Sequence, residues 1–434
     1  STTKGDLFVE AVTKHRPGTA YLDLNNCGAV TDGALALLLE GCPKLDPDKI
    51  VSLNKGSRFV RAVATHRPNL TEINLAECEG VSDEALAMLV TTCTNLQPDT
   101  IASTKKGDLF LDALATHHKD LEKLDISGCA NITDAGLARL VNGFTEANEG
   151  VSTIAVGCKH LQSMTLRKCN GVQGPGVIAL AQSCSELTSV DLTNTSVTDE
   201  TVLCALVANC PKLHPDKIRC DFAKTDVFAV AVSKAWPTLV EIDLAGAVTG
   251  AGLAVLAARC PQLRPEKVLG SVDAAAVWQA VVKRSETKDT VNKSDGTDVV
   301  KNSDSTDTVQ LVLDLRGQNV PDAILAEVVE ACDLEPDDVL SSDKGDAFCA
   351  AVARRHPALE RLSLYDCDAL TDKGVEELSR GCTSLKHVDL MKCRLVTQKA
   401  LFALLSSCPQ LHPDAIISRL KGRGVGFLKA VATS

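Results

Sequence analysis

Apolar and polar positions alternate along this chain in a pattern that returns about every 51 residues. Residues 70–78 read Leu-x-x-Ile-x-Leu-x-x-Cys, and this alternation predicts a short, half-buried strand. Ser82 or Asp83 then offers a helix N-cap, and apolar residues follow at helical spacing over 85–90. Each copy of the pattern therefore predicts a strand followed by a helix.

A second kind of segment separates these copies. It reads Pro-Asp-Lys-Ile at 47–50 and continues into a Lys-Gly-x-x-Phe motif, which predicts another helix. The motif begins at Lys4, Lys55, Lys106 and Lys344. The 51-residue unit is therefore interpreted as two repeats of alternating type, about 25 residues each.

A fixed period of this size predicts a solenoid. We expect an α/β fold: a curved horseshoe with parallel strands on its inner face and helices outside. About fifteen repeats would form a single stack over residues 1–434. Two segments break the period and are read as insertions, one at 145–156 and a polar one at 285–308. The second is expected to be a solvated loop, with a regulatory or partner-contacting role as the alternative.

The first type of repeat resembles a known family. Residues 158–169 carry the frame Cys-x-x-Leu-x-x-Leu-x-Leu-x-x-Cys, with Met at one Leu position, and Cys184 follows. This frame resembles the cysteine-containing leucine-rich repeats of F-box ubiquitin-ligase substrate receptors. The Gly-Ala-Leu-Ala helix start at 33–36 is also similar to the GALA repeats of bacterial effectors. The alternation of two repeat types is similar to that of ribonuclease-inhibitor-like proteins.

Composition restricts the partners and the compartment. The net charge is −11 and the pI is near 5.4, so we expect no nucleic-acid partner. No apolar run reaches the length of a membrane helix, so no membrane insertion is expected. Many of the eighteen cysteines recur in pairs 15 residues apart, and Thr195 takes one of these positions. Such positions indicate core packing by free thiols in the cytoplasm or another reducing compartment, with secretion kept open as an alternative.

An acidic residue stands at the fourth strand position of every second-type repeat, where a plain leucine-rich repeat has Leu. Asp48 is the first example, and Pro47 precedes it, which is awkward in a central strand. We expect the carboxylate to accept backbone N–H groups at a turn or to cap a short helix. An ion site is the alternative.

The central strand positions predict a ladder of charges along the inner face. With neighbouring strands about 4.8 Å apart, Asp23 would face Lys49, and Lys217 would face both Asp191 and Asp243. The ladder would either relieve charge repulsion within the stack or form a polar groove for a charged partner. Its predicted members are Asp23, Lys49, Asp125, Asp191, Lys217, Asp243 and Lys267.

Aromatic residues make up only 3% of the chain, so the sequence does not indicate a tight aromatic-anchored interface in most repeats. Two strands near the C-terminus are the exception, because they place interaction-prone side chains 26 residues apart. We predict a partner-binding patch there, called the C-terminal patch: Arg361, Ser363, Tyr365, His387, Asp389 and Met391.

Catalytic and metal chemistry find little support. The histidines fall at repeated positions, such as His66 and His117 at a helix end and His214 before a Pro-Asp turn, and we expect them to cap or pack. Cys204, Cys210 and Cys220 match no zinc frame. No phosphate loop or nucleophile elbow is present, and we predict no catalytic residue, cofactor or metal.

The main hypothesis is therefore a non-catalytic protein-interaction scaffold with protein partners of unknown identity. One alternative is the substrate-recognition arm of an F-box-type ubiquitin ligase, although no F-box-like segment precedes the repeats. Another is an architectural subunit. Since the chain opens in one Lys-Gly helix and is expected to end in another over 421–431, uncapped terminal repeats could join end to end or to a larger assembly.

Overall fold

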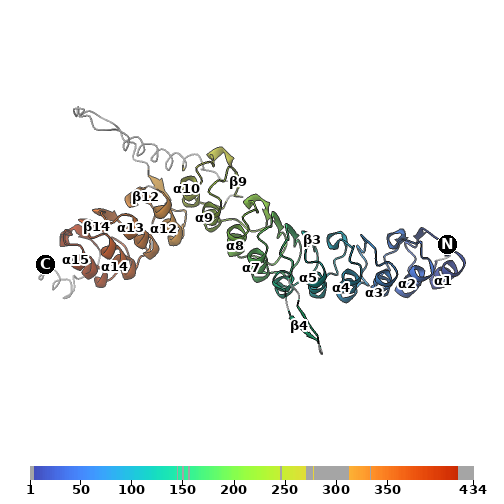
Figure 1. Ribbon diagram of the computed structural model, residues 1–434. Helices are drawn as coiled ribbons and strands as arrows, with labels where there is room; N and C mark the ends of the chain where they lie inside the picture. Colours follow the sequence, from blue (N-terminus) through green and yellow to red (C-terminus); the bar gives the residue numbers. More distant parts are fainter. Residues whose placement is uncertain are drawn as a thin grey trace, which may run out of the picture. The chain divides into compact units, whose positions relative to one another are not determined.

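The computed structural model describes residues 4–143, 145–148, 151–154, 157–244, 247–269, 277, 312–332 and 334–418. The chain divides into two compact units, 1–222 and 223–434. Each is a stack in which helices form one layer and short strands and turns form the other (Figure 1). The polar insertion at 285–308 and the expected terminal helix at 421–431 lie outside the described residues. The single stack of about fifteen repeats stays a prediction.

The helices of unit 1 are regular and short, nine or ten residues each: α1 (Asp6–His15), α2 (Asp32–Gly41), α3 (Ser57–His66), α4 (Asp83–Thr92), α5 (Asp108–His117), α6 (Asp134–Asn142), α7 (Gly174–Ser183) and α8 (Thr201–Asn209). Its parallel strands are β1 (Leu22–Asp23), β2 (Ile50–Val51), β3 (Lys123–Asp125), β6 (Ser163–Thr165), β7 (Ser189–Asp191) and β8 (Ile218–Arg219). Three 3₁₀ helices are η1 (Pro47–Lys49), η2 (Pro98–Thr100) and η3 (Pro215–Lys217).

Unit 2 repeats the same plan. Its helices are α9 (Asp226–Ala235), α10 (Gly250–Arg259), α12 (Asp322–Ala331), α13 (Asp346–Arg355), α14 (Asp372–Gly381) and α15 (Gln398–Ser407). Its strands are β9 (Ile242–Asp243), β10 (Val268–Leu269), β11 (Leu313–Asp314), β12 (Val339–Leu340), β13 (Arg361–Ser363), β14 (His387–Asp389) and β15 (Ile416–Ile417). The 3₁₀ helices are η4 (Pro265–Lys267), η5 (Pro336–Asp338) and η6 (Pro413–Ala415).

The strands pair in parallel, as the sequence predicted, but in short groups. In unit 1, β3, β6, β7 and β8 form one sheet and β1 pairs with β2. In unit 2, β13, β14 and β15 form a three-stranded sheet, and β9 pairs with β10 and β11 with β12. The predicted α/β repeat solenoid, with strands on one side and helices on the other, is confirmed within each unit.

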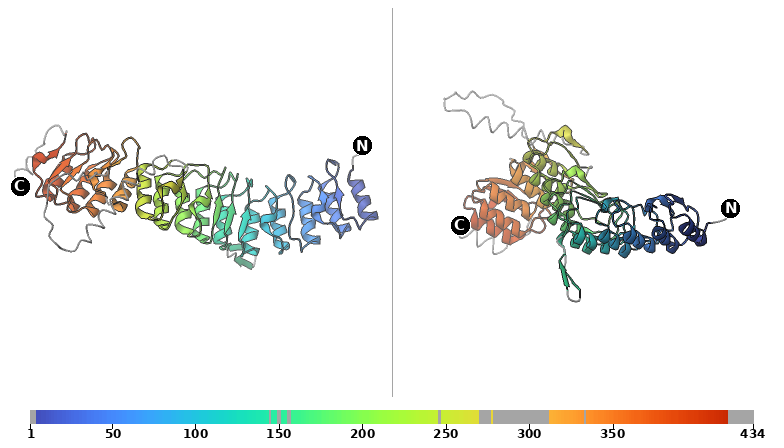
Figure 2. Two further views of the ribbon diagram at one scale, coloured as in Figure 1. Left: turned by 90° about the horizontal axis from the view of Figure 1, so that it is seen from above. Right: turned by 45° about the vertical axis from the view of Figure 1, so that its right-hand side comes forward.

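An antiparallel hairpin interrupts the parallel order of unit 1. Strands β4 (Thr145–Asn148) and β5 (Val151–Ile154) pair with each other and occupy the place of the insertion expected at 145–156. The hairpin projects beyond the layer of helices (Figure 1, Figure 2).

Proline and aspartate shift the second-type strands away from their expected positions. Pro47 and the two residues after it form η1, so the strand begins only at Ile50. Because a 3₁₀ helix offers no ladder acceptor to the next strand, the acidic side chain takes that place. The Oδ1 of Asp48 accepts the Asn74 N–H at 2.9 Å, and the Oδ1 of Asp337 accepts the Ser363 N–H at 2.7 Å. The expected role as an acceptor of backbone N–H groups is confirmed at these two positions.

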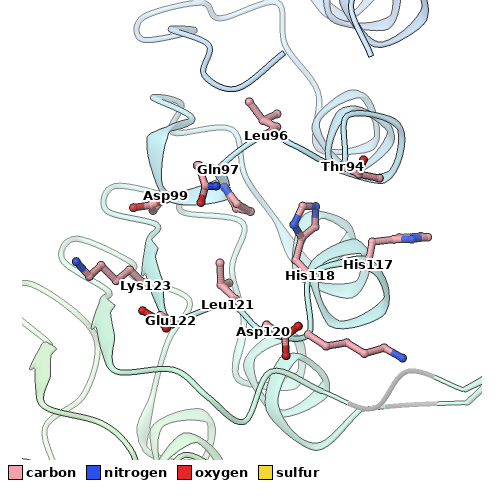
Figure 3. Close-up of a pocket in the computed structure, with 12 residues that line it drawn as sticks. Thr94, Leu96, Gln97, Asp99, His117, His118, Asp120, Leu121, Glu122 and Lys123 are labelled. Carbon is pink, nitrogen blue, oxygen red and sulfur yellow. The ribbon is translucent and has the colours of Figure 1, made fainter. Parts of the chain in front are cut away.

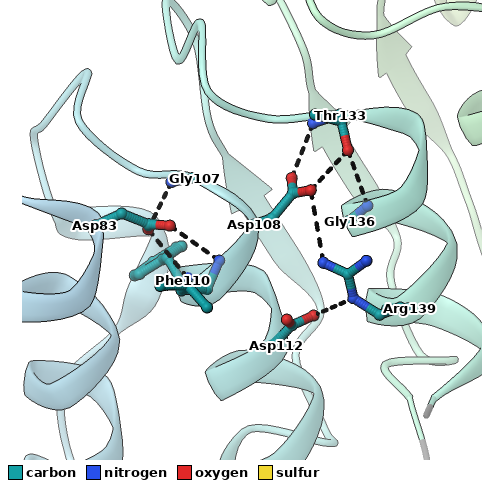
Figure 4. Close-up of polar contacts among 9 residues, drawn as sticks. Asp83, Gly107, Asp108, Phe110, Asp112, Thr133, Gly136 and Arg139 are labelled. Atoms are coloured by element: carbon teal, nitrogen blue, oxygen red, sulfur yellow. Dashed lines mark hydrogen bonds and ion pairs between the residues drawn. The ribbon is translucent and has the colours of Figure 1, made fainter.

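A carboxylate in the first turn of many helices caps the helix of the next repeat. Asp83 starts α4, and its two oxygens accept the backbone N–H groups of Gly107, Leu109 and Phe110 at 2.7, 2.9 and 3.1 Å (Figure 4). Asp108 then starts α5 and accepts both the N–H and the hydroxyl of Thr133. These bonds satisfy helix N-terminal donors that have no partner within their own helix.

The same capping recurs in both units, in two forms. Asp32 and Asp322 follow the pattern of Asp83. Asp6, Asp226, Asp346 and Asp372 follow the pattern of Asp108 and bind the Thr at the next N-cap. We call these six residues, together with Asp83 and Asp108, the capping aspartates.

The capping aspartates explain the glycine of the Lys-Gly motif. A Cβ atom at Gly107 would lie 2.5 Å from the Oδ2 of Asp83, and one at Gly56 would lie 2.6 Å from the Oδ2 of Asp32. Glycine is therefore required because the carboxylate of the preceding repeat approaches the backbone closely.

The lysine and phenylalanine of the motif are buried together. The Nζ of Lys106 lies 5.6 Å from the centre of the Phe110 ring and donates to the Asp125 carbonyl at 2.8 Å. Lys344 repeats this arrangement, 5.0 Å from the Phe348 ring. Burial lowers the pKa of both ammonium groups, and the ring and the carbonyl oxygen compensate the charge. A further copy, with Thr in place of Gly, begins at Lys224.

All eighteen cysteines are free thiols, and fifteen of them are buried. Several donate to carbonyl oxygens of the preceding repeat, such as Cys169, whose Sγ lies 3.0 Å from the Ile126 oxygen. Thr195 occupies the equivalent position one repeat later and bonds to the Leu192 carbonyl. The cysteines pack as small apolar groups, as their periodic positions predicted.

Removing one capping aspartate should uncouple two repeats. We expect Asp83→Ala to lower the free energy of unfolding by about 3 kcal/mol, because three N–H donors lose a charged acceptor. Urea unfolding followed by circular dichroism measures the loss. Glu84→Ala, at the exposed neighbour in the same turn, is the matched control and should cost much less stability, because this carboxylate interacts mainly within the first turn of its own helix and with its N-cap Ser82. Equal effects of the two variants would contradict the capping role.

The buried thiols predict a loss of stability at alkaline pH. Burial raises the pKa of Cys158 and Cys184 to about 12 and that of Cys169 to about 11, from an ordinary value of 9.0. Between pH 9 and the raised pKa, the thiols of the unfolded chain have lost their protons while those of the folded chain retain them. The free energy of unfolding therefore falls as the pH rises above about 9. Each thiol contributes a slope of about 1.4 kcal/mol per pH unit.

Urea unfolding at pH 8, 9 and 10 measures this slope. The buried lysines act in the opposite direction, because a lowered folded pKa adds stability as the pH rises, but only three lysines of the described part of the chain show this shift. Cys169→Thr should make the slope shallower by the contribution of one thiol. The substitution introduces the residue that the chain itself has at the equivalent position, Thr195. An unchanged slope in this variant would assign the pH dependence to other groups.

Candidate protein-binding surface

The C-terminal patch is assembled on neighbouring strands of unit 2. Arg361 faces His387 in the register of β13 and β14, and Ser363 faces Asp389. The chain continues in step beyond the strands, since the Asp366 N–H donates to the Met391 carbonyl at 2.8 Å. The structure therefore brings the six predicted residues onto one face, while Leu362 and Val388 between them point into the core.

Tyr365 is the aromatic centre of this patch and is 47% exposed. The Nζ of Lys392, in the next repeat, lies 4.7 Å from the centre of its ring and 3.4 Å from the Oδ2 of Asp366. Hydrogen bonding to Tyr365 and Asp366 raises the pKa of Lys392. The lysine thus holds an exposed aromatic ring in place from the neighbouring strand. Sequence reasoning did not include Lys392 in the patch.

Asp389 has a structural role within the patch. Its Oδ1 accepts the Met391 N–H at 2.9 Å and closes a turn at the end of β14. Lys392 follows with a φ of +66°, the left-handed conformation that such a turn requires. The same turn occurs after Asp23, Asp125 and Asp191, whose carboxylates accept the N–H two residues on.

The predicted charge ladder does not have the expected register. Asp23 faces Val51 rather than Lys49, and Asp191 faces Arg219 rather than Lys217. The reason is the 3₁₀ helix, which displaces each strand by two residues and places Lys49, Lys217 and Lys267 at its end. Asp125 pairs with Thr165 and Asp243 with Leu269. The proposed Asp23–Lys49 and Asp191–Lys217 pairs were therefore wrong.

Other ion pairs join neighbouring repeats. Their residues lie 26 positions apart, which is the length of one repeat, so the two side chains lie side by side. Beside the C-terminal patch Lys386 binds Glu360 at 2.6 Å, and Arg394 binds Asp368 at 3.4 Å. Lys105 and Glu79 pair in the same way in unit 1, and Lys267 pairs with Glu241 at 3.8 Å in unit 2. Exposed pairs of this kind contribute little to stability, about 0–1 kcal/mol each.

The histidines and cysteines have the local roles expected of them where contacts are defined. The Nδ1 atoms of His214 and His412 accept the N–H groups of Asp216 and Asp414 and cap η3 and η6. The Nε2 of His118 lies 2.9 Å from the Val90 carbonyl at a helix end. Among the described residues, no group of three His, Cys, Asp or Glu side chains could hold a metal ion.

A model of the leucine-rich repeat family matches residues 117–141, which include β3 and most of α6. Residues 117–141 therefore match a leucine-rich repeat, and the strand-and-helix plan of this segment recurs in both units. Within the part of the chain that the structure describes, no helix is long and apolar enough to cross a membrane.

Two curated proteins share part of these leucine-rich repeats. F-box/LRR-repeat protein 4 of Bos taurus is 26% identical over 125 residues, covering 29% of this chain and 18% of that protein. BTB/POZ domain-containing protein FBL11 of Arabidopsis thaliana is 25% identical over 173 residues, covering 36% of this chain and 17% of that protein. The chain therefore spans less than a fifth of the length of these relatives.

Solved structures of low identity also align with the chain. The yeast Rad7 and Elc1 complex gives a TM-score of 0.32 at 14% identity, covering 90% of this chain and 91% of that one. The internalin inlF of Listeria monocytogenes gives 0.31 at 14% identity, covering 96% and 94%. LegL7, a leucine-rich repeat-containing protein of Legionella pneumophila, gives 0.21 at 10% identity, covering 99% and 94%.

Proposed function

We propose that this chain is a non-catalytic protein-interaction scaffold and that the C-terminal patch contacts a protein partner. The observation that carries the proposal is Tyr365, an exposed aromatic ring held by Lys392 on the strand face of unit 2. Aromatic and arginine side chains dominate the energy of protein interfaces, and a ring already held in one position loses little conformational entropy on binding.

The surroundings of Tyr365 support this role. Arg361 and His387 lie exposed on adjacent strands, and half-buried Met391 follows β14. Ile417, 51% exposed, adds apolar surface beside Asp389 in the register of β14 and β15. The patch thus combines an apolar centre with charged neighbours, the composition that favours a specific contact.

The proposal predicts that Tyr365 carries partner binding. In full-length protein cross-linked in its native extract, Lys386 and Lys392 should link to one common partner. Tyr365→Ala should reduce the yield of these links at least tenfold, because truncating an aromatic anchor costs about 2 kcal/mol of binding energy. Quantitative mass spectrometry of the cross-linked peptides measures the yield.

Tyr21→Ala is the matched control, since Tyr21 is the only other tyrosine and is 58% exposed in unit 1. This variant should retain the links. Equal retention in Tyr365→Ala would overturn the assignment of the patch. Links confined to the first repeat, for example through Lys4, would instead favour the architectural subunit.

A second candidate is the substrate-recognition arm of an F-box-type ubiquitin ligase. It is favoured by the similarity of part of this chain to F-box/LRR-repeat protein 4 of Bos taurus. If this candidate holds, the partner cross-linked at the C-terminal patch is a ligase substrate. Tyr365→Ala would then lengthen the partner's half-life in a cycloheximide chase, and Tyr21→Ala would not. An unchanged half-life despite lost cross-links would leave a scaffold without a role in turnover.

A further inference from the structure

A groove of about 500 Å³ opens on unit 1 between the end of α5 and the turn before η2. Its walls come from residues 94–99 and 117–123 (Figure 3). His118 and Leu121 lie between the two walls, and the charged side chains of Asp99, Asp120 and Glu122 stand around them. The whole groove lies within two consecutive repeats.

The preceding copy of these repeats explains why the groove exists. Arg67 stands 51 residues before His118 and is its counterpart. The Nη2 of Arg67 donates to the carbonyl oxygens of Leu39, Cys42 and Leu45 at 3.2, 2.9 and 3.3 Å. A guanidinium group therefore occupies this place in the first copy and binds the carbonyl oxygens at the end of α2.

His118 replaces only part of this arrangement. Its Nε2 reaches the carbonyl of Val90, the counterpart of Leu39, at 2.9 Å. The imidazole is shorter than an arginine side chain and has fewer donors. The groove reaches Leu96, the counterpart of Leu45, whose carbonyl oxygen accepts from Arg67 one copy earlier.

The open space favours a planar cation. Helix α4 ends at Thr92 with Cys93 as its C-cap, and the lining of the groove begins at the next residue, Thr94, close to the negative end of the helix dipole. Asp99, Asp120 and Glu122 add three carboxylates, against Lys119 and Lys123 on the same walls. A guanidinium has five donors in one plane and can reach several carbonyl oxygens at once, which an ammonium group does less well.

We propose that this groove binds the guanidinium of an arginine side chain supplied by a partner protein, in the position that Arg67 fills one copy earlier. The site is separate from the C-terminal patch of unit 2 and does not depend on its role. It is a subsite for an arginine-bearing segment, because the groove is larger than the guanidinium alone and leaves room for adjoining peptide.

The test uses the full chain and N-acetyl-arginine methylamide as the probe, with the lysine analogue for comparison. Isothermal titration and ligand-observed NMR should give saturable binding of the arginine probe and at least threefold weaker binding of the lysine probe. His118→Arg fills the groove from within and should weaken arginine binding at least tenfold. His66→Arg adds the same charge at an exposed helix end one copy earlier and should leave binding unchanged.

A second variant tests the converse. Arg67→His should open a groove of similar shape and add a second, weaker site, because Asn69 and Thr71 stand where the groove has Asp120 and Glu122. Circular dichroism confirms that the repeats remain folded. Binding that is non-saturable, equal for both probes or unaffected by His118→Arg would overturn the proposal. If Arg67→His unfolds the first repeats, the comparison of His118→Arg with His66→Arg decides alone, and neither result bears on Tyr365.

Discussion

The capping of most helices by a carboxylate from the repeat before them is the interaction on which the rest of the stack depends. A helix of ten residues is too short to be stable by itself in water, and its first N–H groups have no partner within the helix. Asp83 and its counterparts provide those partners from the adjacent repeat. A helix capped in this way is completed only when the repeat before it is folded. Cooperativity therefore passes between these repeats through hydrogen bonds to the backbone as well as through apolar contact.

Burying the capping carboxylate costs desolvation energy, and residues of the Lys-Gly motif help to accommodate it. Burial raises the pKa of Asp83, which shows that desolvation of the carboxylate outweighs the N–H groups that favour its charged form. Glycine at position 107 lets the carboxylate approach the backbone, and Lys106 beside it satisfies a strand carbonyl under the cover of Phe110. The first three positions of the motif thus act together. The lysine binds a strand carbonyl, the glycine receives the carboxylate of the preceding repeat, and the aspartate caps the next helix.

Features that recur with the 51-residue period could be predicted from the sequence. The N-caps and the cysteine positions predicted the helices and the packed thiols, because each follows from local spacing. The strand predicted at 70–78 was wrong in extent, since only an isolated parallel bridge between Asn74 and Ala102 forms there. The register of the charge ladder was not accessible in this way. Pro47 fixes a 3₁₀ turn whose length moves the strand by two residues, and such a displacement exchanges the partner of every charged side chain. The pairing of Arg361 with His387 was predictable since both strands belong to first-type repeats without a proline turn.

The groove in unit 1 depends on a difference between two residues at equivalent positions of the repeat. Arg67 and His118 occupy equivalent positions, and both cap the helix of the preceding repeat, so a sequence comparison treats them as variants of one structural role. Their difference lies in reach: the guanidinium extends to three carbonyl oxygens and the imidazole to one. In a stack whose units satisfy each other's backbone groups, a shorter side chain at one capping position creates a site whose preferred ligand is the group that the other repeat retains. Tyr365 departs from the pattern in the opposite sense, since it adds an exposed ring where first-type repeats carry Ala76 or Ser127 after the strand. In both cases the regular positions hold the stack together, and the positions that depart from the repeat are those at which we propose binding.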